Sequence, residues 1–145
     1  MASCSKKASA LIAKLRARSS TAREEIIREL VALGPTAVPA LGKALEHSDY
    51  KVRMAAAEAL GDIADEGAIE PLITALSDTS KNTQAAAAEA LALIGDAAVP
   101  ALLDALIGND QSARKWAAEA LGTIGDASVA QELMNRLNDQ NLEVQ

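Results

Sequence analysis

Apolar residues recur along this 145-residue chain with a period of 30 or 31 residues. One series of leucines with this spacing consists of Leu15, Leu45, Leu76, Leu106 and Leu137. A second series, lying 15 residues after members of the first, consists of Leu30, Leu60, Leu91 and Leu121. A fixed period of this size is typical of repeat proteins. We therefore predict one domain of five units, at about residues 5–34, 35–64, 65–95, 96–125 and 126–145, with the last unit incomplete.

Both halves of a unit have the spacing of an amphipathic helix. In the second unit, Val38, Leu41 and Leu45 share one stripe, and Val52 and Leu60 share another. The second halves are near copies of one another: AAAEALGDI at 55–63, AAAEALALI at 86–94 and AAEALGTIG at 117–125. Because neither helix of a hairpin can bury its stripe alone, the units must stack. The predicted fold is all-α, an α-solenoid of about nine helices.

Glycines occupy two kinds of position in this pattern. Three of them follow second helices, where a left-handed residue commonly ends a helix: Gly34, Gly95 and Gly125. Gly61 and Gly122 instead lie inside second helices, where each costs roughly 1 kcal/mol relative to alanine. Close approach of a neighbouring helix would explain that cost. The alternative is neutral variation within an alanine-rich segment.

The repeated unit resembles a known family. First helices of the type PLITAL (71–76) and second helices of the type KVRMAAAEALGDI (51–63) resemble the HEAT repeat, above all the short form named after phycobilisome lyase subunits. The resemblance implies a right-handed superhelix with first helices on the convex layer and second helices on the concave layer. Members of this family are mostly scaffolds and adaptors. The Val-Arg pair that opens the family's second helix is complete only at Val52 and Arg53, and Thr83 and Gln84 replace it in the third unit.

Composition narrows the functions that this fold could carry. Half of the residues are apolar, yet the chain has no Phe, one Trp and one Tyr, so the core must consist of Ala, Leu, Ile and Val. The net charge is −6. Residues 1–30 carry seven basic and three acidic side chains, whereas residues 31–145 carry seven basic and seventeen acidic ones. Most of the surface therefore disfavours nucleic acid, which requires a basic footprint.

The residues that catalysis or metal binding would require are scarce. One cysteine, Cys4, and one histidine, His47, exclude an internal disulfide and a zinc site of Cys/His type. Phosphate-binding loops and nucleophile motifs are absent, and His47 is expected to contact carbonyl groups at a helix end. No membrane span or signal peptide is expected, which favours a cytoplasmic location. We predict a protein without cofactor, metal or enzymatic activity.

The side chains that point away from the apolar stripe of the second helices form the candidate binding surface. Residues selected in this way are Tyr50, Lys51, Met54, Glu58, Asp62, Glu89, Lys115, Trp116 and Glu119. Both aromatic residues of the chain fall in this set, and Trp and Tyr are enriched among residues that contribute most binding energy. Trp116 would either anchor a partner or fill the gap between second helices beside alanines. Tyr50 would either contact a partner or close the hairpin turn.

Glu58, Glu89 and Glu119 share one register and predict a row of glutamates along the concave face, where Arg28 takes the equivalent place in the first unit. Such a row could steer a basic peptide or protein segment. The alternative is that glutamate, a good helix former, simply occupies a solvated face.

The carboxyl end breaks off within a hairpin. The apolar residues Leu133, Met134 and Leu137 then lack a full covering neighbour. Repeat arrays normally close with a polar cap. This end is therefore expected either to pack against a second copy of the chain or to continue into a longer array.

Together these features predict a scaffold or adaptor that binds another protein on the concave face. The alternative, suggested by the family name, is a subunit of a bilin lyase-type complex that attaches a chromophore. A nucleic-acid binder is least favoured, because the predicted concave face is acidic.

Overall fold

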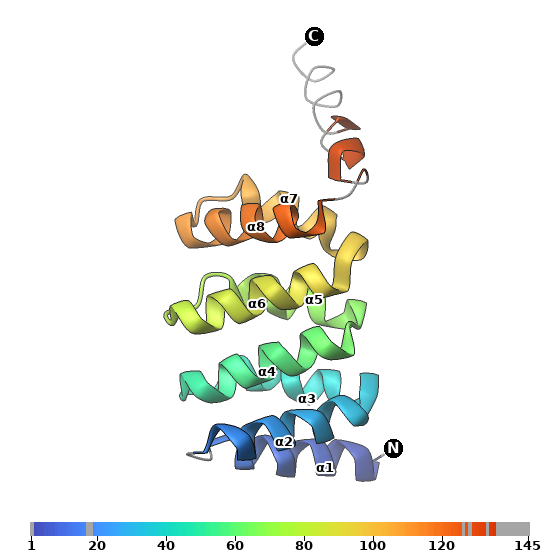
Figure 1. Ribbon diagram of the computed structural model, residues 1–145, viewed down its shortest axis with the longest axis vertical. Coiled ribbons are helices and arrows are strands. Elements are labelled where there is room, and N and C mark those ends of the chain that lie inside the picture. The colour runs from blue at the N-terminus through green and yellow to red at the C-terminus, as the bar shows by residue number, and fades with distance from the viewer. Residues whose placement is uncertain (1, 17–18, 126, 128, 133, 136–145) are drawn as a thin grey trace.

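The computed structural model describes residues 2–16, 19–125, 127, 129–132 and 134–135. Within these residues the chain forms helical hairpins stacked along one axis (Figure 1). The α-helices are α1 (Ala2–Ala13), α2 (Ser20–Ala32), α3 (Val38–Ala44), α4 (Tyr50–Ile63), α5 (Ile69–Ala75), α6 (Lys81–Ile94), α7 (Val99–Leu106) and α8 (Gln111–Ile124). Residues 127, 129–132 and 134–135 are also helical, where the sequence predicts a ninth helix.

The second helices α2, α4 and α8 begin where a side-chain oxygen accepts a hydrogen bond from a free backbone N–H group. Asp49 accepts a hydrogen bond from the N–H of Lys51 at the start of α4, and Asp110 accepts one from Ala113 at the start of α8. Short 3₁₀ turns lead into α3, α5 and α7. Proline occupies the first turn of α3 and α7, where the missing N–H costs least.

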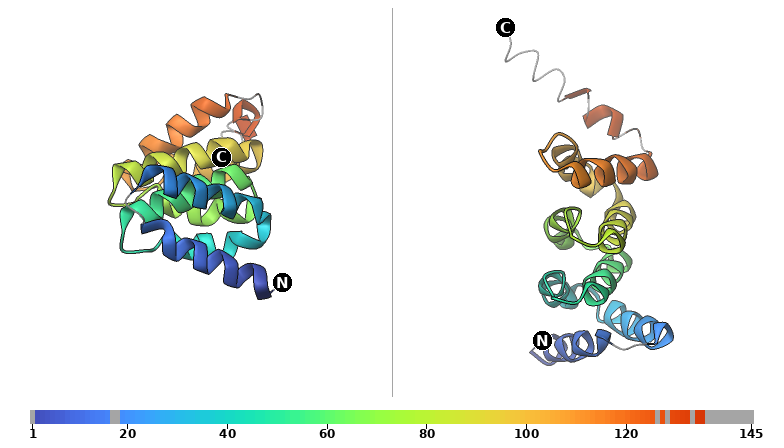
Figure 2. Two further views of the ribbon diagram at one scale, coloured as in Figure 1. Left: turned by 60° about the horizontal axis from the view of Figure 1, so that its bottom comes forward. Right: turned by 90° about the vertical axis from the view of Figure 1, so that its left-hand side faces the viewer.

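First and second helices form two separate layers, as the end-on view shows (Figure 2). The second helices α2, α4, α6 and α8 pack against one another far more extensively than do the first helices, and α4 with α6 is the most extensive contact. A stack curves toward the side on which successive helices lie closest together, so that side is the concave one. The fold is therefore the expected α-solenoid, with the second helices on its concave face.

The core of the stack consists mainly of leucine and alanine, with a few valines and Ile26. Of the first leucine series, Leu15, Leu45 and Leu76 are buried, and Leu106 is half-buried. The second series is buried throughout. Alanines fill the space between successive second helices, and Ala56, Ala59 and Ala87 are completely inaccessible to solvent. These small side chains allow the backbones to approach closely, as the composition predicts.

One apolar stretch, Lys81–Leu106, has the length and composition to cross a membrane, with a mean hydropathy of 1.6, and it is the only one in the described ranges. The chain turns within it at Gly95, whose φ is +82°, so that α6 and α7 are separate helices. Half of the window is buried inside the stack. The buried half, which includes Leu91 and Leu102, belongs to the core of the solenoid.

The positive φ angles expected at the glycines that follow second helices are confirmed, but only Gly125 is a left-handed cap like the one predicted, because Gly95 has a ψ of −136°. Gly34, Gly95 and Gly125 have φ angles of +67°, +82° and +52°. In the second unit the equivalent residue is Ala64, which ends α4 in the left-handed conformation with φ +56° and ψ +37°. Its N–H donates to the carbonyl of Leu60, so the same type of helix end forms with a residue less suited to it.

Replacing Ala64 with glycine is expected to stabilise the fold by about 1 kcal/mol, because it removes the steric penalty that a Cβ incurs in this conformation. Denaturant unfolding followed by circular dichroism measures this gain. Ala118, on the exposed side of α8, provides the control, because glycine there should destabilise by about 1 kcal/mol. A loss of stability in Ala64→Gly would contradict the left-handed assignment.

The glycines inside the second helices differ from each other. A Cβ placed on Gly61 would lie 2.7 Å from the Cα and 2.8 Å from the Cβ of Ala90 on α6, closer than real contacts allow. A Cβ placed on Gly122 would meet no described atom within 4 Å. The close approach predicted for these glycines is therefore confirmed at Gly61 only.

Candidate functional site

The concave face contains two adjacent hollows. The first, of about 320 Å³, lies between α2, α4 and α6, and we call it the acidic hollow. Its charged lining consists of Glu24, Arg28, Glu58, Asp62 and Glu89. The second, of about 460 Å³, lies between α6 and α8, and we call it the apolar hollow. Four alanines line it, together with Glu89, Leu93, Trp116, Glu119 and Thr123.

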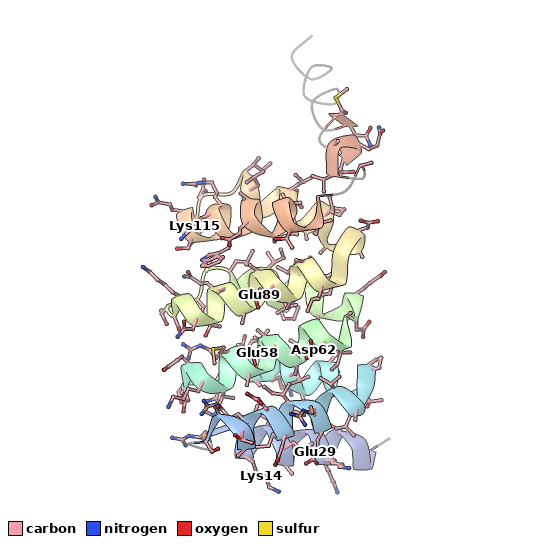
Figure 3. The ribbon with its side chains drawn as sticks, in the orientation of Figure 1. Lys14, Glu29, Glu58, Asp62, Glu89 and Lys115 are labelled. Carbon is pink, nitrogen blue, oxygen red and sulfur yellow. The ribbon has the colours of Figure 1, made fainter. Side chains whose placement is uncertain are left out.

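The acidic hollow brings together three of the predicted carboxylates. Glu58 and Asp62 on α4 and Glu89 on α6 lie on the same side of the stack (Figure 3). The pKa of Glu58 is raised above its ordinary value of 4.5, first because the surrounding helices exclude water, then because Glu89 and Asp62 repel a further negative charge. Glu24 adds to this rise, and the guanidinium of Arg23 opposes it. The glutamates of this face therefore influence one another.

This coupling predicts a pH-dependent effect of one substitution. A raised pKa in the folded state means that the charged form of Glu58 opposes folding, and that this opposition disappears as pH falls through the folded pKa towards 4.5. Glu58→Gln is therefore expected to raise the midpoint of thermal unfolding slightly at about pH 7 and to leave it unchanged at about pH 4. Calorimetry at the two pH values measures both effects. An equal rise of the midpoint at both pH values would mean that the effect comes from helix propensity and not from the charge of Glu58.

Trp116 lies across the boundary between α6 and α8. Its indole Nε1 donates a hydrogen bond of 2.8 Å to Oε1 of Gln84, and the Nζ of Lys115 lies 4.9 Å from the ring centroid. The equivalent positions in the preceding units hold Ala55 and Ala86, which are buried between second helices. Trp116 is half-buried and also lines the apolar hollow. It combines both predicted features, packing between helices and presenting part of its ring to the groove.

Leu93 is a prominent residue of this face that the sequence analysis did not select. It is 61% exposed and lines both hollows, as does Glu89. Its register is that of Asp62 and Thr123 in the neighbouring units. The repeat period therefore contains the signal that identifies it, because the register that selects Asp62 also selects Leu93.

The remaining predicted residues differ in exposure. Tyr50, the first residue of α4, is 41% exposed, and its carbonyl accepts a hydrogen bond from Oγ1 of Thr83. Lys51 and Met54 are half-buried, and Met54 packs against the core. Glu119 and Lys115 are exposed. Glu58 lines the acidic hollow and Trp116 lines the adjacent apolar hollow, whereas Tyr50 lies outside the linings of both.

A chain of polar contacts links the second, third and fourth units. Arg53 pairs with Asp78 of the next unit through Nε–Oδ2 and Nη2–Oδ1 distances of 2.9 and 3.1 Å, and the two side chains are 13% and 10% exposed. Gln84 donates to the carbonyl of Asp78 and accepts from Trp116. Arg53 therefore links the second unit to the third. In the third unit, a buried glutamine that sequence reasoning treated only as a loss takes over the connection to the fourth.

His47 does not contact helix-terminal carbonyls through its ring, contrary to the expectation. Its Nδ1 accepts a hydrogen bond of 3.0 Å from the N–H of Asp49, because the turn between α3 and α4 presents a donor there. Among the described residues no group of three or more His, Cys, Asp and Glu side chains is placed to hold a metal ion.

Only one of the three residues predicted to mediate self-association at the carboxyl end lies among the described residues. Met134 is 58% exposed, and Leu133 and Leu137 lie outside the described residues. The expected packing of this end against a second copy therefore stays a prediction.

Comparison with known proteins gives a consistent result. The sequence matches the family described as HEAT repeats over residues 8–80 and 69–145. A chain of the complex of CpcE and CpcF of phycocyanin lyase from Nostoc sp. PCC7120 is 28% identical, with a TM-score of 0.67, and the match covers 90% of this chain and 85% of that chain. A crystal structure of an engineered protein is 27% identical over 86% of this chain and 67% of that chain, with a TM-score of 0.47, too low to support an argument. None of the curated proteins matches.

Proposed function

Because the chain belongs to the family of HEAT-repeat proteins, we propose that it is a non-catalytic scaffold that binds a partner protein on the concave face of its second helices. The observation that carries this proposal is the pair of hollows, with Leu93 and Trp116 presenting apolar surface beside a group of carboxylates. Apolar groups framed by charged ones are typical of surfaces that bind proteins.

Trp116 is suited to anchor such a partner. Its hydrogen bond to Gln84 and its contact with Lys115 hold the ring in one orientation before binding. Little conformational entropy is then lost when a partner packs against the ring, and rigid aromatic side chains often contribute much of the binding energy. The apolar hollow beside the ring supplies the space that a partner side chain would occupy.

Affinity purification from the cells in which the chain is found, followed by mass spectrometry, tests the proposal. The wild-type chain should retain a specific protein that Leu93→Ser and Trp116→Ala both lose. Ile107→Ser is the matched control, because Ile107 is 69% exposed and follows the first helix α7. A partner retained by the two concave variants, provided that they unfold at the same temperature as wild type, would refute the proposed face.

A second candidate function is a subunit of a bilin lyase-type complex. It is favoured by the similarity to a chain of the phycocyanin lyase complex, which extends over most of both chains. The chain would then act together with a second subunit. Mixing it with that subunit, a bilin and a phycobiliprotein lacking its chromophore should yield a coloured covalent adduct. Colourless protein after removal of free bilin would exclude this candidate and leave the scaffold proposal intact.

A further inference from the structure

Leu93 forms a ridge between the two hollows of the concave face. It lines both of them, and its side chain is 61% exposed. On the side of α8, the floor beside this ridge consists of the methyl groups of Ala85, Ala88 and Ala120. An aliphatic side chain placed there would remove the apolar surface of Leu93 and of the alanines from water. The apolar hollow thus fits an aliphatic side chain of a partner.

The acidic hollow on the other side of Leu93 has an excess of negative charge. Its lining contains four carboxylates and one guanidinium, that of Arg28. The raised pKa of Glu58 indicates that its carboxylate is partly desolvated and is repelled by Glu89, Asp62 and Glu24. Ile27, Ala86 and Ala90 line the same hollow and offer apolar surface to the methylene stem of a long side chain. A lysine or arginine meets both conditions, because its stem is apolar and its end is cationic.

The arrangement of the hollows restricts how a partner could occupy both. They adjoin along the stack, sharing Glu89 and Leu93, so the carboxylates between α4 and α6 and the apolar hollow between α6 and α8 are separated by about one step between packed helices, roughly 8–10 Å. Two residues about two turns apart on one face of a helix have the same separation, roughly 10 Å at 1.5 Å per residue. A helical segment can therefore place one side chain in each hollow.

We propose that the concave face recognises a helical segment of a partner protein that carries an aliphatic side chain and, about two turns away on the same face, a lysine or arginine. The aliphatic side chain packs between Leu93 and Trp116. The cationic one enters beside Glu58, Asp62 and Glu89. This inference rests on the proposed function and adds to it the chemistry of the partner.

Synthetic peptides test this recognition directly. The probe is an alanine-based helical peptide with leucines on one turn and lysines two turns further along. One matched peptide has glutamate in place of lysine, and another has serine in place of leucine. Trp116 is the only tryptophan of the chain, so its fluorescence reports occupancy of the apolar hollow without a label. Titrations are made at low salt and repeated at high salt.

The leucine–lysine peptide should shift the emission of Trp116, and both matched peptides should bind at least about tenfold more weakly. Leu93→Ser should weaken binding by about tenfold, and Glu58→Gln combined with Glu89→Gln by about three- to tenfold at low salt, with less effect at high salt. The double variant Glu46→Gln with Glu70→Gln makes the same change in net charge outside both hollow linings and should bind as wild type does. Equal binding of all peptides, or equal losses in both double variants, would overturn the inference.

The natural partner separates failure of this inference from failure of the proposed function. A partner whose binding is weakened by Trp116→Ala but unaffected by Glu58→Gln with Glu89→Gln would overturn the inference and preserve the concave scaffold. A partner unaffected by either set of variants would overturn both. Weakening by both sets, with wild-type binding in the control double variant, supports both.

Discussion

Replacing Gly61 with alanine is expected to lower the free energy of unfolding by about 1–3 kcal/mol, although alanine is the better helix former. The added Cβ would lie 2.7 Å from the Cα of Ala90, and a backbone atom cannot move aside as the end of a side chain can. The helices α4 and α6 would have to separate at their most extensive contact. Equilibrium urea unfolding followed by circular dichroism measures the change.

Gly122 provides a control at the equivalent position of α8. A Cβ there meets no described atom within 4 Å, so Gly122→Ala should gain stability by up to about 1 kcal/mol from helix propensity. The two substitutions are chemically identical and lie in the same register, yet the expected effects have opposite signs. A gain in stability for Gly61→Ala would show that α4 and α6 are further apart than the structure places them.

Removing the carboxylate of Asp78 is expected to cost about 3 kcal/mol of stability. Asp78→Ala leaves the guanidinium of Arg53, whose side chain is 13% exposed, without its carboxylate partner. It also removes the acceptor for the N–H of Ser80, 2.8 Å from Oδ1, in the turn before α6. Asp62→Ala, which removes an exposed carboxylate from the concave face, should change stability far less and serves as the control.

A double-mutant cycle tests whether the pair itself is responsible. Arg53→Met with Asp78→Ala should be destabilised by less than the sum of the two single substitutions, because the second change removes the charge that the first leaves unpaired. Additive losses would mean that Asp78 acts only through the turn before α6. Such a result would show that the salt bridge does not help to hold the second and third units together.

The stacking of helical hairpins could be predicted because it depends on local periodicity. The two leucine series mark which face of every helix is buried, and the glycines with positive φ mark where second helices end. The separate behaviour of Gly61 and Gly122 could not be predicted in this way. Both have the same sequence context, and what distinguishes Gly61 is the approach of Ala90 on α6, for which the described residues show no counterpart at Gly122.

The candidate site was predicted in part. The register placed Glu58, Asp62 and Glu89 together, because residues at equivalent positions of stacked units must lie on one face. Leu93 has the register of Asp62, one unit later, so the repeat period places it on this face although its apolar side chain does not stand out among the core leucines. The dual environment of Trp116 depends on the side chain of Gln84, 32 residues earlier, whose orientation follows from its hydrogen bond to Asp78. No local sequence pattern specifies that contact.

Nuclear magnetic resonance titration with the purified natural partner tests the concave-face proposal most directly. The chain has 145 residues, small enough for backbone assignment, and its amide signals would locate the interface without any substitution. The proposal predicts that chemical shift changes concentrate on α4, α6 and α8, with the largest near Glu58, Leu93 and Trp116. Changes confined to α3, α5 and α7 would contradict it and would place the partner on the convex face.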